Sequence, residues 1–133
     1  MKSYTYARAL QAALIGIAMT GSATLARADI KDYEFQLVDK TIKKGDAIIS
    51  VRLIHKPDGK PVPDAVIFAT RLDMAPDGMQ EMATKIAPVP GTEPGTYRFK
   101  ASIGMAGRWQ LSLGAKVQGE TGTVENKLVM TAQ

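Results

Sequence analysis

Short segments in which apolar and polar residues alternate dominate the chain after residue 32, and this pattern constrains the fold more than any other feature. Ile49, Val51 and Leu53 lie at every second position of a run rich in β-branched residues, and residues 109–113 repeat the pattern. Successive side chains of a strand point to opposite faces of a sheet, so this spacing predicts strands with one buried face.

Turn residues separate these segments at fairly regular intervals, and little of the chain has helical periodicity. The Pro57-Asp58-Gly59 run is typical of a turn, as is the 119–122 stretch. We therefore expect an all-β fold, an immunoglobulin-like antiparallel β-sandwich of six to seven strands. The predicted strands are 33–37, 48–54, 65–72, 96–103, 109–113 and 123–131. The predicted core residues are Phe35, Val51, Leu53, Phe68, Tyr97, Phe99, Trp109, Leu111 and Leu113, and Met130 continues the alternation of the last strand.

Residues 73–95 form the longest stretch without alternation. Four prolines and three glycines interrupt it, and a helical turn fits only around Gln80 to Lys85. Long irregular connections in small domains often carry binding function. We therefore expect a functional loop here.

The first 28 residues resemble an export signal. Lys2 and Arg8 precede an apolar stretch, and Ala26-Arg27-Ala28 has the small-x-small form of a cleavage site. This predicts a periplasmic protein cleaved after Ala28, whose single domain runs over residues 29–133. The apolar stretch is shorter than a membrane span, and nothing later is apolar enough to cross a membrane. A retained N-terminal anchor is the alternative interpretation.

Charge gives no indication of nucleic-acid binding once the predicted signal is set aside. The whole chain has 17 basic and 13 acidic residues, but three basic and no acidic residues precede Asp29. The remainder carries 14 basic and 13 acidic residues, which is no electrostatic footprint for nucleic acid. Lys43-Lys44 fits a solvated turn.

No catalytic motif is recognisable, so we do not expect an enzyme. The chain has no cysteine, and its serines lack the context of an activated nucleophile. His55 is the only histidine, at a strand-to-turn junction. It is interpreted as a turn residue, with metal ligation as the alternative.

Methionines gather around the irregular stretch. Met74, Met79 and Met82 lie in LDMAPDGMQEM, and Met105 lies between glycines in SIGMAGRW. A helical turn would place Met79 and Met82 on one face. Thioether sulfurs favour Cu(I) or Ag(I) over hard cations, so these four residues are candidate metal ligands. Methionine is also a pliable core filler, so packing is the alternative, with Met74 capping the core and Met82 on the tryptophan ring.

Three acidic residues flank these methionines, Asp73, Asp77 and Glu81. Their spacing is not that of a calcium loop. We expect solvated loop charges rather than metal ligands.

The segment GTYRFKASIGMAGRWQLSLGAKVQGE, preceded by LDMAPDGMQEM, resembles the YtkA-like/FixH-like domains of exported bacterial proteins. The resemblance extends over most of residues 33–132. It implies a periplasmic β-sandwich associated with copper handling near efflux systems and oxidase-assembly factors, with Met74, Met79, Met82 and Met105 as the ligand candidates. No histidine lies beside the methionines, which favours Cu(I) over Cu(II).

Two functions follow from these observations. The first is a periplasmic Cu(I)/Ag(I)-binding or carrier protein in copper homeostasis. The second is a metal-free interaction module that docks onto a heavy-metal efflux or oxidase-assembly partner through the loop face. A methionine-rich exposed loop serves either function.

Overall fold

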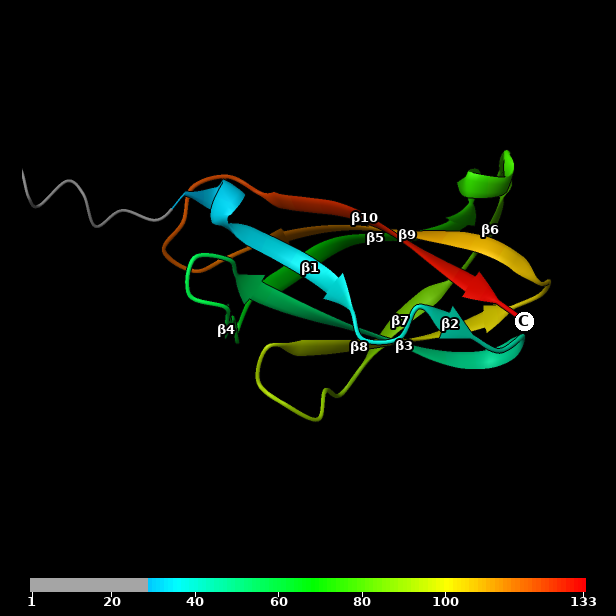
Figure 1. Ribbon diagram of the computed structural model, residues 1–133, viewed down its shortest axis with the longest axis horizontal. Helices are drawn as coiled ribbons and strands as arrows, with labels where there is room; N and C mark the ends of the chain where they lie inside the picture. Colours follow the sequence, from blue (N-terminus) through cyan, green and yellow to red (C-terminus); the bar gives the residue numbers. More distant parts are fainter. Residues whose placement is uncertain (1–28) are drawn as a thin grey trace, which may run out of the picture.

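Two β-sheets face each other across one apolar core in the computed structural model, which describes residues 29–133 (Figure 1). The predicted signal peptide and its cleavage site after Ala28 lie outside the described residues. A short 3-10 turn, η2 (Ile30–Asp32), leads into the first strand. The strands are β1 (Tyr33–Leu37), β2 (Thr41–Ile42), β3 (Gly45–His55), β4 (Lys60–Pro61), β5 (Val66–Met74), β6 (Met79–Thr84), β7 (Ile86–Val89), β8 (Thr96–Ile103), β9 (Gly107–Lys116) and β10 (Val124–Ala132), and a 3-10 turn, η3 (Ala75–Asp77), joins β5 to β6.

The first sheet has the strand order β1-β3-β8-β7, with the two-residue β4 added beside β3. All its pairs are antiparallel. The register puts Phe35 opposite Leu53 and Ile49 opposite Phe99, so apolar residues meet on the inner face.

The second sheet has the order β2-β10-β9-β5-β6. Its pairs are antiparallel except that β2 runs parallel to the end of β10. The described chain changes sheet five times, after β1, β2, β4, β6 and β8, and these crossings connect the two layers. The β-sandwich prediction is confirmed.

The inner faces form a single core, as the alternation predicts. Seven of the nine predicted core residues are buried: Phe35, Val51, Leu53, Phe99, Trp109, Leu111 and Leu113. Met130 is also buried, at 1% exposure. Tyr97 is half-buried, with its hydroxyl donating to the Val62 carbonyl oxygen and accepting from the Ala65 amide.

Phe68 is a wrong prediction, since its side chain is 57% exposed. The ladder between β5 and β9 shifts register between Ile67 and Ala69, so Phe68 is an extra residue in a β-bulge. A bulge breaks the two-residue period and redirects the side chain. The ring lies over Gly114 on β9, whose lack of a side chain leaves room for it.

The stretch 73–95 is also more regular than predicted. It contains β6 and β7, and the helical turn expected around Gln80 to Lys85 is a strand instead. Prolines and glycines interrupt the alternation in this stretch, so its two short edge strands were not predicted. An edge strand tolerates proline because it needs ladder bonds on one side only. The two-residue strands β2 and β4 are too short to produce a sequence pattern. Within residues 29–133 no helix is long and apolar enough to cross a membrane.

Candidate functional site

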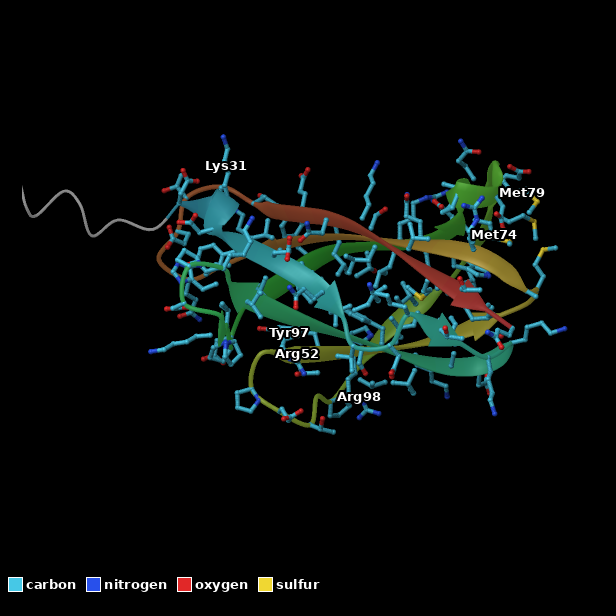
Figure 2. The ribbon with its side chains drawn as sticks, viewed as in Figure 1. Lys31, Arg52, Met74, Met79, Tyr97 and Arg98 are labelled. Carbon is cyan, nitrogen blue, oxygen red and sulfur yellow. The ribbon has the colours of Figure 1, made fainter. Side chains whose placement is uncertain are left out.

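Met74 and Met79 face each other across the turn that joins β5 to β6. They are partners in the ladder between these strands, and η3 makes the connection. Pro76 fits the first turn of η3, and Gly78 ends it in the left-handed conformation at φ 75°. Figure 2 shows both labelled methionines at one end of the sandwich. The chain thus folds back and brings these two residues together.

Met82 lies in an irregular part of the ladder between β5 and β6. Asp73 pairs with Ala83, and the adjacent Met74 pairs with Met79, so residues 80–82 bulge out of the ladder. Met82 is 41% exposed within this bulge. The prediction that a helical turn aligns Met79 with Met82 is wrong, because both residues belong to the strand β6.

Met105 reaches this end from the hairpin between β8 and β9. Its side chain is 39% exposed, and its carbonyl oxygen accepts a hydrogen bond from the buried Trp109 Nε1 at 3.1 Å. The hairpin continues into Gly107, against which the Met74 methyl group packs. The hairpin and the β5–β6 turn are therefore in direct contact, and sulfur atoms gather at this end (Figure 2).

An arginine–aspartate clasp holds the two segments together. Asp77 of η3 accepts hydrogen bonds from the Arg108 amide and from Arg108 Nε, both at 2.8 Å. The guanidinium also donates to the Pro76 carbonyl oxygen at 2.7 Å. These bonds from Arg108, the backbone amide first, lower the pKa of the Asp77 carboxyl below its ordinary value. The prediction that Asp77 is a solvated loop charge is therefore wrong, because Asp77 is bonded to Arg108 of β9.

The four candidate methionines differ sharply in accessibility. Met74 is only 1% exposed and belongs to the core, as the packing alternative holds. Met79 is partly buried against that core, while Met82 and Met105 are open to solvent. We call the four residues together the methionine end. Its accessible thioethers come from Met79, Met82 and Met105, with Met74 behind them.

Asp73 is not the solvated loop charge that was predicted, since it is 4% exposed. Its carboxylate accepts hydrogen bonds from Arg71 Nε at 2.7 Å and from the Ala75 amide at 2.9 Å. A buried carboxylate needs such partners. Asp73 therefore fixes the start of η3 and so the position of the methionine turn.

His55 lies at the opposite end of the sandwich, at the end of β3 (Figure 1). Its Nδ1 is 3.1 Å from Asp58 Oδ1, and its ring lies 5.0 Å from that of Tyr33. This agrees with the turn-residue interpretation. Within residues 29–133, histidine, aspartate and glutamate form no group of three that could hold a metal ion.

The architecture and the methionine end define a small β-sandwich domain with a thioether-bearing edge. The sequence model of the family described as YtkA-like matches residues 27–114, well over half of the chain. The chain therefore belongs to the YtkA-like family. The match includes all four methionines of the site.

Solved structures give more distant similarities. The Lin-41 filamin domain is 17% identical, with a TM-score of 0.45, covering 77% of this chain and 92% of that one. The ZirS C-terminal domain is 12% identical, with a TM-score of 0.46, covering 98% of this chain and 85% of that one. No curated protein matches the chain.

Proposed function

We propose that this YtkA-like domain is a periplasmic binding or carrier protein for Cu(I), with Ag(I) as a surrogate, and that the thioethers of the methionine end bind the ion. One observation carries the proposal. The Asp77–Arg108 clasp and the contact of Met74 with Gly107 join the Met105 hairpin to the β5–β6 turn, and Met79 and Met82 follow this turn in β6. Neutral sulfurs from two separate segments thus lie at one end of the fold.

The donor chemistry supports a soft monovalent ion. Thioethers are soft, polarizable and uncharged, so they prefer Cu(I) to Zn(II) or Ca(II). Met79, Met82 and Met105 are accessible enough to take up and release an ion, whereas Met74 supports them from the core. No thioether has to lose a proton, so binding should change little between neutral and mildly acidic pH.

Titration of the purified protein with Cu(I) against a competing chelator tests the proposal. Met79→Leu, Met82→Leu and Met105→Leu should each weaken Cu(I) binding by about tenfold or more, a loss at least as large as that of a ligand's outer-shell partner. Each variant keeps its apolar volume, so the free energy of unfolding should change by less than about 1.5 kcal/mol. Met130→Leu, in the core of β10, is the matched control and should leave Cu(I) affinity unchanged.

A variant with leucine at all four positions decides the outcome. If it binds Cu(I) as tightly as the parent protein, the proposal is wrong. Met74→Leu alone shows whether Met74 is a metal ligand or a packing residue. Replacing a packing residue should change the free energy of unfolding more than the Cu(I) affinity.

The exposed apolar surface of Met82 and Met105 favours a second candidate function. A metal-free module would use this surface to dock onto a heavy-metal efflux or oxidase-assembly partner, since methionine adapts to irregular surfaces. The leucine variants separate the two candidates, because they keep the apolar surface and remove the donors. Partner binding that survives in the four-leucine variant supports the docking module. Partner binding that requires Cu(I) supports the carrier function.

A further inference from the structure

Half of β5 lacks a neighbour on one side. Residues 66–73 of β5 pair with β9, but β6 pairs only with Leu72, Asp73 and Met74. Residues 66–71 therefore form a free sheet edge. In the part of the chain that the structure describes, no turn or side-chain hydrogen bond engages the backbone of these six residues. Their outward amide and carbonyl groups are available to another strand.

The edge is open because the chain changes sheet at this point. Thr84 of β6 pairs with Leu72 in the second sheet, and only Lys85 separates it from Ile86, which pairs with Ala101 of β8 in the first sheet. After this crossing, β7 runs along the edge of the opposite sheet. A strand that continued the line of β6 would lie beside residues 66–71.

An apolar groove follows the open edge. It has a volume of about 300 Å³ and lies between β5 of one sheet and β7 and β8 of the other. Its apolar walls are formed by Ile67, Phe68, Pro88, Val89 and Phe99. A second groove of about 520 Å³ shares Thr70 with the first and extends it along β6. Together they provide space for side chains of an added strand beside β5.

The side chains at this edge only partly match those that usually protect an edge. Charged residues, prolines and bulges normally limit pairing, and here Arg71 and the bulge at Phe68 are the protecting features. Here Val66 and Phe68 are 59% and 57% exposed, and β5 has no proline. The bulge at Phe68 shortens the regular part of the edge to residues 69–71, so an added strand would be short. Large apolar side chains at such an edge are typical of a recognition surface.

The charges beside the grooves indicate which partner fits. Lys85 and Lys100 are exposed and line the second groove with Arg71, and Arg98 lines the first. Asp46 is the one acidic residue that lines either groove. Asp73 neutralises part of the Arg71 charge through its ion pair, so the positive excess comes chiefly from the two lysines and Arg98. Pairing β5 with β5 of a second copy would bring these like charges together, whereas an acidic strand would complement them.

We propose that the open edge of β5 binds an extended peptide segment with alternating acidic and apolar residues, by addition of a strand in line with β6. The main-chain bonds of residues 69–71 would hold the peptide. Its apolar side chains would enter the groove beside Phe68, and its carboxylates would face Lys85 and Lys100. This surface is distinct from the methionine end and does not depend on metal binding.

A synthetic peptide series tests the proposal with the purified protein. The probe is a fluorescein-labelled eight-residue peptide of alternating valine and glutamate. One control carries lysine in place of glutamate, and another carries N-methyl groups on alternate amides, which removes the donors of a β-ladder. Fluorescence anisotropy should show at least about tenfold tighter binding of the acidic peptide than of the lysine peptide at low salt. The N-methylated peptide should not saturate.

Protein variants test the charge and the location. The double variant K85E/K100E should weaken binding of the acidic peptide by about tenfold, since two attractive contacts become repulsive. The double variant K43E/K44E makes the same change in exposed lysines that line neither groove, and it should leave binding within about twofold. Amide chemical shifts of residues 66–71 should move on titration with the acidic peptide.

Several results would overturn the proposal. These are equal binding of the N-methylated peptide, no saturable binding of the acidic peptide, and shift changes confined to other elements. A dimer formed through β5 that the acidic peptide does not displace, seen by sedimentation, would assign the edge to a second copy instead.

Discussion

Trp109 shows how one residue serves both the core and the candidate site. Its side chain is 2% exposed, and its Nε1 donates to the carbonyl oxygen of Met105. The ring therefore packs between the sheets while its polar atom fixes the turn that presents Met105. A buried tryptophan needs such a partner for its N–H group.

Trp109→Ala should lower the free energy of unfolding by about 3–5 kcal/mol, because it removes a buried aromatic side chain and leaves a cavity. Denaturant unfolding measures the change. Val129→Ala on neighbouring β10, where the side chain is 46% exposed, is the control and should stay within about 0.5 kcal/mol of the parent. A loss below about 1 kcal/mol for the tryptophan variant would contradict its place in the core.

Gly107 is the second residue on which the site depends. Its φ is +140°, and a Cβ atom there would lie 2.5 Å from Met74 Cε and 2.8 Å from Asp77 Oδ2. Gly107→Ala should therefore destabilise the protein by about 1–3 kcal/mol through strain and overpacking. Gly104→Ala in the same hairpin meets nothing within 4 Å and should change stability by less than about 0.5 kcal/mol. Equal stabilities of the two variants, measured by thermal unfolding, would show that Gly107 is not tightly enclosed.

Among the elements, η3 is held mainly by contacts made outside its own backbone. Its three residues are too few for a stable helix, so Asp73 at its start and Arg108 from β9 determine its position. The turn is therefore a rigid connection between β5 and β6. Asp77 was predicted to be a solvated loop charge because its partner Arg108 is 31 residues away and produces no local pattern.

Asp77→Ala should loosen this clasp without unfolding the sandwich. The Arg108 amide loses its acceptor, so its hydrogen exchange should become faster, while amides in the centre of β9 keep their protection. Asp58→Ala is the matched control, because Asp58 accepts from the Lys60 amide at the other end of the molecule. Its exchange effect should be confined to Lys60 and its neighbours. Unchanged exchange at Arg108 in the Asp77 variant would show that the clasp does not protect this end.

At the scale of the whole molecule, alternation was enough to predict the sandwich and most of its core. It failed where the period was broken, as at the Phe68 bulge, and where strands were short or contained proline, as in β7. The candidate site was predictable only as a set of residue types. The contact of the β5–β6 turn with the Met105 hairpin depends on the bonds between Asp77 and Arg108, whose positions are 31 residues apart. Such a contact leaves no pattern in the local sequence.

A hydrogen bond between Tyr33 and Glu120 lies at the end of the molecule opposite the methionines. It should make the free energy of unfolding fall at alkaline pH. The Tyr33 hydroxyl at the start of β1 donates to Glu120, in the turn between β9 and β10, at 2.8 Å. Burial and then this carboxylate raise the pKa of Tyr33 from 10.0 to about 12. The folded state thus favours the neutral phenol, and a phenolate would face a like charge.

The sign of the pH dependence follows from this raised pKa. The contribution of Tyr33 is fully present below the unfolded value near 10 and is lost as pH rises towards 12. Tyr33→Phe removes the titration, so its free energy of unfolding should be lower than that of the parent at pH 8. It should then decline less steeply between pH 10 and 12, where the two curves approach each other. Because Tyr97, whose pKa is also raised by burial, is present in both proteins, its effect cancels in the difference. Parallel curves in denaturant unfolding across this pH range would show that the contact with Glu120 does not contribute to holding β1 against the β9–β10 turn.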